Sequence, residues 1–278
     1  MASVLVLGED SSAQAGKVLE TLIKHIFRDL DPGCDPERFR FEPANDDARK
    51  LLAANQWAGD KLGNDRYIAR TRLHRLIAAT LIRDDGFVLH HVDADRTWGE
   101  RQRRPSVNAA HLEEHIVAHV GRELEVHYRG PPVPRRRART TVERLSEAEI
   151  EARVGEHMSR FIRVIPHWEI EAWLYQHTDR ATALCPGEPR CTRSPSCHDK
   201  LAAWRDDRGA LDEVEHPSDQ LCLGKRHNEA LVRGFPTHEV LGAGKSFAAL
   251  AHDMLGCTAL LHALERTHET VFPPSEST

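Results

Sequence analysis

The chain has 278 residues and a formal net charge of −5, with 40% hydrophobic and 29% charged residues. This length suits one elaborated domain, or one domain with an appendage, and it is enough to bury a substantial core. No apolar run is long enough to cross a bilayer, and the first residues lack the features of a signal peptide. We therefore expect a cytoplasmic protein with no membrane partner, in which the six cysteines are mostly reduced.

Strands and helices alternate in the first third of the chain. Apolar runs predict buried strands at Val4–Leu7 and Phe87–Val92, and an alternating pattern predicts a strand at Arg38–Glu42. Apolar residues at spacings of three and four predict helices at Val18–Leu30 and Ile68–Ile82. This β-α-β-α-β order predicts an α/β fold, an open parallel sheet with right-handed crossovers and helices on its faces.

The middle of the chain continues this alternation. The pattern predicts a helix at Val107–Val120, a short strand at Glu123–Tyr128 and a helix at Ser146–Ser159. A strand at Phe161–Ile165 and a helix at His167–Tyr175 then follow. We expect residues 1–178 to form the α/β domain.

Two further segments complete the predicted organisation. Prolines followed by an arginine run predict a flexible insertion at about 129–145, because proline blocks helix formation and the arginines repel one another. Residues 179–278 are expected to form a mostly helical extension that packs on the first domain. Its last long helix is predicted at Phe247–Leu264.

Acidic residues follow several of the predicted strands. Asp93 and Asp95 would emerge together where their strand ends, and Glu9 follows the first strand. In open α/β sheets, ligands bind at the carboxyl ends of the strands. Glu169 and Glu171 follow a later strand, but they lie about 100° to either side of the inward stripe of their predicted helix, so at most one faces a site. Such acids together need a counter-ion, and Mg²⁺ or Mn²⁺ prefers oxygen ligands.

Each of these acids also has a purely structural interpretation. Asp93 and Asp95 would suit a turn after a strand, because aspartate is common in turns. Glu9 would compensate the charge of a helix N-terminus, where acids are favoured by about 0.3–1 kcal/mol. Glu169 and Glu171 would be solvated acids on the flanks of a helix.

Basic residues occur in two clusters. Their positions along the chain bear on nucleic-acid binding more than the net charge does. Arg101, Arg103 and Arg104 follow the Asp-x-Asp strand, and a second cluster lies at Arg135–Arg139. The second cluster is either a solvated loop or a contact for nucleic-acid phosphates. Lys225 begins a further basic group, Lys225–Asn228, whose placement the sequence does not fix.

Cysteines in the extension suggest a second kind of metal site. Cys185, Cys191 and Cys197 have five residues between successive members, and His198 adjoins the last one. Three thiols and an imidazole can hold zinc, but this spacing is not a compact knuckle, and reduced loop cysteines are the alternative. The segment Gly242–Ser246 is similar to a phosphate-binding loop, but Glu239 stands where that motif needs its first glycine.

The acids and their order resemble the Toprim domain shared by topoisomerases, bacterial primases and OLD-family nucleases. That family has a glutamate after its first strand, matched by Glu9, and an Asp-x-Asp after a later strand, matched by Asp93 and Asp95. Small stand-alone Toprim-like proteins of bacterial defence loci also have a Glu-x-x-Trp-Leu run after a strand. The run Glu171–Leu174 is similar to that motif, which favours Glu171 over Glu169.

The resemblance implies a metal-dependent nuclease acting on DNA or RNA. Glu9, Asp93 and Asp95 would bind Mg²⁺ or Mn²⁺, and Glu171 would support the ion or position the attacking water. The residues expected to hold the nucleic-acid backbone are Arg96, Arg101, Arg103, Arg104 and Lys225. OLD-type nucleases use a basic residue late in the domain, for which Lys225 and Lys245 are candidates. The resemblance further implies an effector in anti-phage defence that acts with a separate ATPase, since the chain has no credible nucleotide-binding loop.

The chain also departs from the family pattern. Asp10 follows Glu9 where the family usually has glycine, and Ala13 stands where it usually has a second acid. The alternative function is therefore a catalytically degenerate Toprim-like subunit that binds a partner protein or nucleic acid.

Overall fold

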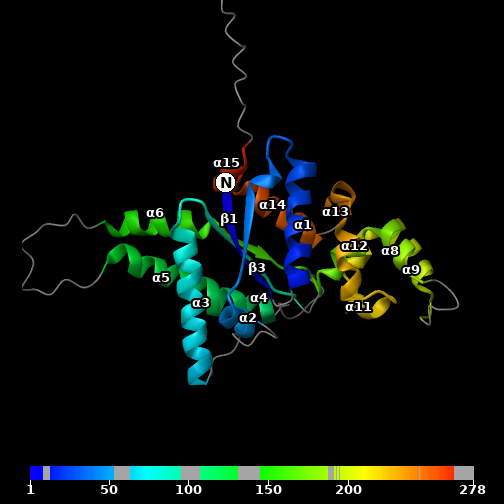
Figure 1. The fold of residues 1–278 in the computed structure, drawn as a ribbon, viewed down its shortest axis with the longest axis horizontal. Coiled ribbons are helices and arrows are strands. Elements are labelled where there is room, and N and C mark those ends of the chain that lie inside the picture. Colours follow the sequence, from blue (N-terminus) through cyan, green and yellow to red (C-terminus); the bar gives the residue numbers. More distant parts are fainter. Residues whose placement is uncertain are drawn as a thin grey trace, which may run out of the picture.

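The computed structural model describes residues 1–8, 13–52, 63–94, 107–130, 145–186, 191, 193, 195–243 and 245–265. Its centre is a sheet of four parallel strands in the order β2-β1-β3-β4. The strands are β1 (Ala2–Gly8), β2 (Phe39–Pro43), β3 (Gly86–His91) and β4 (Phe161–Val164). The predicted α/β architecture with a parallel sheet flanked by helices is confirmed (Figure 1).

The order of the strands reverses between β1 and β3, in the middle of the sheet. From β1 the chain crosses to β2 on one side, and it later returns to β3 on the other side. The carboxyl ends of β1 and β3 are neighbours, with Gly8 paired to His91. At the opposite end of β3, a Cβ on Gly86 would lie 1.8 Å from the carbonyl oxygen of Thr80, so this tight turn requires glycine.

One face of the sheet is covered by α1 and by helices from the end of the chain. These helices are α1 (Ala13–Leu30), α14 (Lys245–Gly256) and α15 (Thr258–Leu264). Their apolar side chains form one core with strand residues such as Val4, Leu89 and Val164. The 3.6-residue period of α1 explains this packing, because its buried residues all lie on one stripe.

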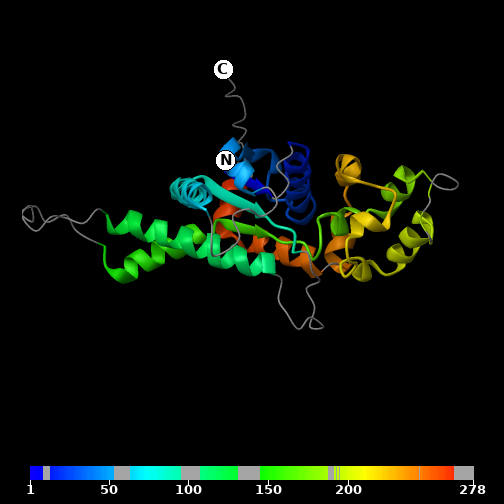
Figure 2. The same cartoon turned by 90° about the horizontal axis from the view of Figure 1, so that it is seen from below.

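The second face is covered by helices from the middle of the chain (Figures 1 and 2). They are α2 (Asp46–Leu52), α3 (Asn64–Ile82), α4 (Val107–Leu112), the π-helical η3 (Glu113–Val117) and α5 (Ala118–Arg129). Leu5, Leu7 and Val88 point to this face, because side chains alternate along a strand. α6 (Glu147–Met158) packs beside α5 (Figure 2).

Between β4 and α14, the part of the chain that the structure describes forms short helices. They are α7 (Glu171–Leu174), α8 (Thr178–Leu184), α9 (Cys197–Asp206), α10 (Arg208–Leu211), α11 (Pro217–Gln220), η5 (Lys225–His227), α12 (Asn228–Val232) and α13 (Thr237–Ala243). α12 and α13 contact α1, so their core is continuous with one face of the sheet. Among the described residues, no single helix has both the length and the apolar character to span a bilayer.

The strand predicted at Glu123–Tyr128 is wrong, since this segment is the end of α5. The alternation of Leu124 and Val126 suggested a strand, but Val126 is 65% exposed. The buried residues are instead Ile116, Val120 and Leu124, four positions apart. A helical period therefore describes the burial, and α5 continues to Gly130, whose φ of 67° ends it.

Two predicted helices have different limits in the structure. The helix predicted at Phe247–Leu264 is divided into α14 and α15, which meet at an angle of 71°. Gly256 ends α14, consistent with the low helix propensity of glycine. The helix predicted at His167–Tyr175 is reduced to α7, and all four of its residues are buried.

Candidate functional site

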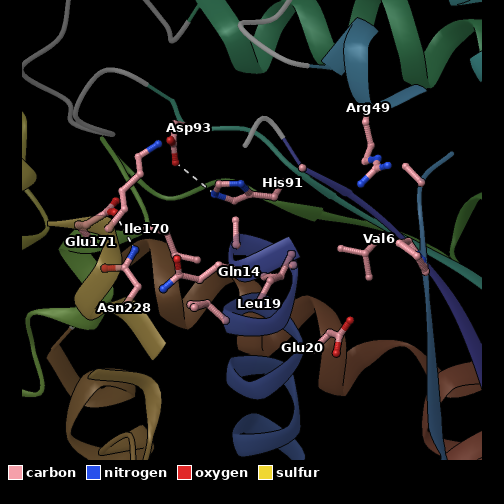
Figure 3. A pocket seen from close by; sticks show the side chains of 17 residues that line it. Val6, Gln14, Leu19, Glu20, Arg49, His91, Asp93, Ile170, Glu171 and Asn228 are labelled. Carbon is pink, nitrogen blue, oxygen red and sulfur yellow. Dashed lines mark hydrogen bonds and ion pairs between the residues drawn. The ribbon is translucent and has the colours of Figure 1, made fainter. Parts of the chain in front are cut away.

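A cavity of about 360 Å³ opens where the carboxyl ends of β1 and β3 meet. Its polar lining includes His91, Asp93, Glu171, Lys225 and Asn228 (Figure 3). These residues come from three separate parts of the chain, which the sheet and the C-terminal helices bring together. The cavity lies at the point where the strand order reverses, which is where ligands bind in open α/β sheets.

Asp93 is held in place by its main chain. The pairing of β3 with β4 continues beyond the strands, through hydrogen bonds from Val92 N to Val164 O and from Ala94 N to Pro166 O. Asn108 Nδ2 donates to Asp93 O at 2.9 Å. The Asp93 side chain remains 24% exposed, and its Oδ1 lies 3.1 Å from His91 Nε2. The main chain at Asp93 is thus fixed, and its carboxylate contacts His91 while it stays accessible from the cavity.

Glu171 is the buried acid of the cavity, with an exposed fraction of 4%. It begins α7, shortly after β4, and its Oε1 accepts a hydrogen bond of 2.8 Å from Asn228 Nδ2 (Figure 3). Burial raises the pKa of Glu171, and the negative charge of Asp93 raises it further, while the Asn228 hydrogen bond lowers it. The two carboxylates are therefore close enough to influence each other.

Glu169 takes a different position from Glu171. Its Oε2 accepts a hydrogen bond of 3.3 Å from Ser218 N, and its Oε1 lies 3.6 Å from His216 Nδ1. Of the two acids, Glu171 lines the cavity and Glu169 does not. At most one of the two acids is expected to face a site, and Glu171 does; the helical projection behind that expectation does not apply, because Glu169 lies before the start of α7.

The two candidate lysines are also separated by the structure. Lys225 lines the cavity, close to Asn228. Lys245 begins α14, and its Nζ binds Glu213 Oε1 at 2.9 Å outside the cavity lining. Lys225 is therefore the lysine placed to meet an anion bound near Asp93.

The rest of the cavity is largely apolar. Val6, Leu19 and Ile170 contribute to this part, and Arg49 on α2 lies across the cavity from Asp93 and Glu171 (Figure 3). The first turn of α1 also reaches the cavity through Gln14, Ala15 and Gly16. A helix N-terminus carries a partial positive charge, which favours a negatively charged ligand nearby.

Several predicted site residues lie outside the described residues. These are Glu9, Asp95, Arg96, Arg101, Arg103 and Arg104, together with the second arginine cluster at Arg135–Arg139. Of the predicted metal and catalytic acids, the structure places Asp93 and Glu171, and it brings them to one cavity.

Sequence reasoning gave no role to His91, Asn228 or Arg49. A signal existed for His91, which lies two residues before Asp93 at the end of the same strand. Asn228 stands in the basic group that begins at Lys225, but nothing local connects it with Glu171, 57 residues earlier. Such a contact depends on the packing of α12 against α7.

A magnesium or manganese ion suits the donors of this cavity. Asp93 and Glu171 offer carboxylate oxygens, which such hard cations prefer. Burial and mutual repulsion both disfavour the charged form of Glu171, and a divalent cation would offset both. Asp93 is the more accessible carboxylate of the pair.

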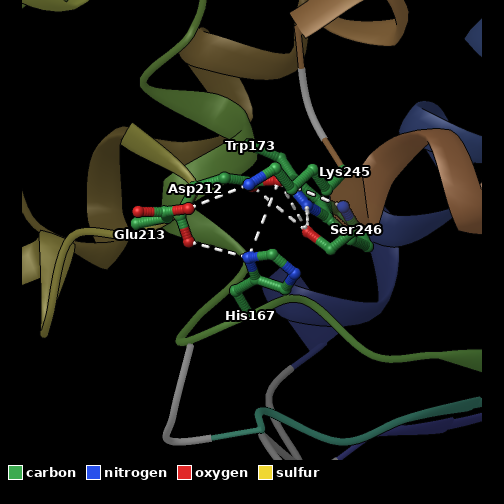
Figure 4. A network of polar contacts seen from close by, with 6 residues as sticks. All are labelled: His167, Trp173, Asp212, Glu213, Lys245 and Ser246. Carbon is green, nitrogen blue, oxygen red and sulfur yellow. Dashed lines mark hydrogen bonds and ion pairs between the residues drawn. The ribbon is translucent and has the colours of Figure 1, made fainter. Parts of the chain in front are cut away.

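A second polar network lies under the C-terminal helices (Figure 4). Asp212 accepts hydrogen bonds from Ser246 N at 3.0 Å and from Ser246 Oγ at 3.1 Å. Trp173 Nε1 donates to Ser246 Oγ at 2.8 Å, and His167 Nδ1 lies 3.0 Å from Asp212 O. These four residues are buried, and the serine contacts the carboxylate and not the imidazole. The network therefore holds α7 and α14 together and does not form a catalytic triad.

The same network explains the segment Gly242–Ser246. Ser246 N, which a phosphate loop would offer to an anion, is bound to the Asp212 carboxylate. Among the described residues around it, the preceding segment is helix α13 and not a strand. The phosphate-loop pattern therefore has a structural origin, in agreement with its missing glycine.

The cysteine pattern of the extension forms a real cluster, with one change from the predicted ligand set. The sulfurs of Cys185, Cys191 and Cys197 all lie within 4.8 Å of one another. His198 is exposed on α9, whereas Cys222 Sγ lies 3.2 Å from Cys191 Sγ. Cys222 is separated from Cys197 by 24 residues, which is why local spacing did not reveal it.

Comparisons of the chain with protein-family models, with curated proteins and with solved structures gave no match.

Proposed function

We propose that the chain is a Toprim-like, divalent-metal-dependent nuclease that hydrolyses phosphodiester bonds in DNA or RNA. One observation carries this proposal. Asp93 and Glu171, which follow the adjacent parallel strands β3 and β4, line one cavity at the edge of the sheet where ligands bind. Lys225 lines the same cavity, so acidic ligands for a cation and a cation for phosphate occur together.

The acidic residues of the cavity would have different roles in hydrolysis. Asp93 would hold Mg²⁺ or Mn²⁺, with Glu9 and Asp95 as the further ligands that the resemblance implies. A bound ion of this kind supplies charge stabilisation at phosphate and a more acidic water. Glu171, whose pKa is raised by burial, would position the attacking water and accept its proton, because a weaker acid is a stronger base. The Asn228 amide fixes the orientation of the Glu171 carboxylate.

Substrate binding would depend on positive charge. Lys225 and the N-terminus of α1 would face the scissile phosphate, and Arg96, Arg101, Arg103 and Arg104 would hold the flanking backbone. Because several phosphates would be contacted, the affinity for nucleic acid should fall steeply as the salt concentration rises. We further propose a role in anti-phage defence beside a separate ATPase, which rests on the resemblance alone.

The test compares two glutamates that lie two positions apart. Purified wild-type chain, Asp93→Asn, Glu171→Gln and Glu169→Gln are incubated with plasmid, single-stranded DNA and tRNA, with Mg²⁺ or Mn²⁺ or with a chelator. We expect metal-dependent cleavage that falls by about 10²-fold or more in Glu171→Gln, the range typical of a lost acid-base group. Asp93→Asn should reduce cleavage at least as much, because it removes a ligand of the ion. Glu169→Gln, whose acid lies outside the cavity, should keep wild-type activity.

Two outcomes would contradict this proposal. Cleavage that survives Asp93→Asn would remove the assigned site. Absence of cleavage on every substrate, while nucleic acid still binds, would favour the degenerate binding subunit. Circular dichroism of each variant confirms that a loss of activity is not a loss of fold.

A further inference from the structure

Four cysteine sulfurs gather at one point of the C-terminal extension. Cys191 Sγ lies 2.9 Å from Cys197 Sγ and 3.2 Å from Cys222 Sγ, and the Cys185 sulfur lies within 4.8 Å of both Cys191 and Cys197. Cys185, Cys191 and Cys197 are buried, and Cys222 is half-buried. Cys191 therefore contacts more than one partner, which is the arrangement of a shared centre and not of isolated pairs.

The size of the cluster suits a zinc ion. With a Zn–S bond of about 2.3 Å, the sulfurs of a tetrahedral site lie about 3.8 Å apart. The two short sulfur distances at Cys191 would lengthen by about 0.6–0.9 Å to reach this spacing, which side-chain rotation can supply. Cys222 N also donates to Cys197 Sγ at 3.0 Å, and such hydrogen bonds to ligating sulfur stabilise a thiolate.

The cysteines belong to the apolar core of the extension, together with Leu201, Leu211 and Leu221. The cluster joins the end of α8, the start of α9 and the segment before η5. α8 has 7 residues and α9 has 10, and helices of this length are marginal in isolation. A metal that links three segments would add stability to this packing.

The segment after Cys222 leads directly to the cavity. Lys225 and Asn228 follow Cys222 by three and six residues, and both line the cavity. Asn228 is the residue that donates to Glu171 Oε1. A fixed Cys222 would therefore restrain one wall of the cavity, which begins three residues further along the chain at Lys225.

We propose that Cys185, Cys191, Cys197 and Cys222 bind one structural zinc ion, which anchors the segment Cys222–Asn228 and so positions Lys225 and Asn228 at the cavity. Four protein ligands close the coordination sphere, as in structural zinc sites, so this ion takes no part in hydrolysis. The zinc site itself stands independently of the proposed nuclease function, because it rests on the cysteine geometry alone.

The first test measures metal in the untagged full chain after growth with zinc. Elemental analysis should give one zinc per chain for the wild type and for His198→Ala, whose imidazole is exposed. Cys222→Ser should lose most of its zinc, while Cys257→Ser, which changes a buried cysteine outside the cluster, should keep it. Loss of zinc in His198→Ala with retention in Cys222→Ser would overturn the ligand set.

A second measurement uses only wild-type chain, in case Cys222→Ser does not fold. Replacement of zinc by Co²⁺ should produce thiolate-to-cobalt charge-transfer bands and intense visible bands of a tetrahedral site. A chain that binds neither zinc nor Co²⁺ would overturn the proposal. Disulfide bonds among the four cysteines, seen as a mass decrease before reduction, would overturn it as well.

Hydrogen exchange tests whether the zinc ion anchors the segment Cys222–Asn228 at the cavity. Zinc removal by a chelator should increase hydrogen exchange in the peptide that covers Cys222–Asn228, with little change in β1 or β3. Unchanged exchange in that peptide would contradict the anchoring role even if zinc binds. These measurements need no nuclease assay, so failure here and failure of the proposed function are distinguishable.

Discussion

Glu171 and Asp212 are both buried acids, but their surroundings differ. The Asp212 carboxylate accepts hydrogen bonds from Ser246 N and Ser246 Oγ and has no exposed surface. Glu171 has a hydrogen bond from Asn228, neighbours a second carboxylate and borders a cavity. A buried acid that is satisfied by fixed donors stabilises the fold. A buried acid beside another acid and a cavity is placed for a ligand.

The largest expected effect is on the stability of the fold, when Asp212 is replaced. Asp212→Ala should lower the free energy of unfolding by about 3–5 kcal/mol, because the buried N–H and O–H of Ser246 would lose their acceptor. Urea denaturation measures the change. Exposed Asp206→Ala is the control, and it should stay within about 0.5 kcal/mol of the wild type. A loss for Asp212→Ala no larger than that of the control would show that the network does not stabilise the fold.

The second prediction uses the two lysines, one from each region. Lys225→Met should reduce phosphodiester cleavage by about 10–100-fold, equivalent to the loss of one charge-assisted hydrogen bond of about 1.5–3 kcal/mol. Lys245→Met, which removes an exposed contact with Glu213, should leave the rate within about twofold. Equal effects of the two substitutions would mean that Lys225 has no special place in the reaction.

The third prediction concerns opposite pH dependence of the two regions. Burial raises the pKa of Glu171 above its usual value of 4.5, so the folded state holds this proton more tightly than the unfolded state. Its contribution to stability is present at low pH and is lost as the pH rises through the folded pKa. Burial lowers the pKa of His167 below 6.5, so its contribution is lost as the pH falls below 6.5 toward the folded pKa.

Thermal unfolding between pH 4 and pH 8 tests these signs. Glu171→Gln should be more stable than the wild type at high pH. His167→Asn should be less stable than the wild type at high pH, and this difference should disappear at low pH. Differences of about 1 kcal/mol correspond to roughly 2–4 °C in Tm for a chain of this size. Mn²⁺ should reduce the Glu171 difference, since a cation compensates the carboxylate charge. If the stability difference from the wild type changed with pH in the same direction for both variants, burial would not be the cause of the two pKa shifts.

The sequence by itself determined the elements whose pattern is local. Apolar runs located β1, β3 and β4, and the 3.6-residue period located α1 and α3, because burial on one side leaves a periodic trace in the chain. The position of Asp93 just after the end of a strand followed from the same reasoning.

Only the tertiary structure decided which distant residues meet. Leu124 and Val126 fit a strand as well as a helix until packing buried one and exposed the other. Cys222 joins the cysteine cluster from 25 residues beyond Cys197, and Asn228 reaches Glu171 across 57 residues. Contacts of this kind depend on how helices pack on the sheet, and neither spacing nor periodicity along the chain records that packing.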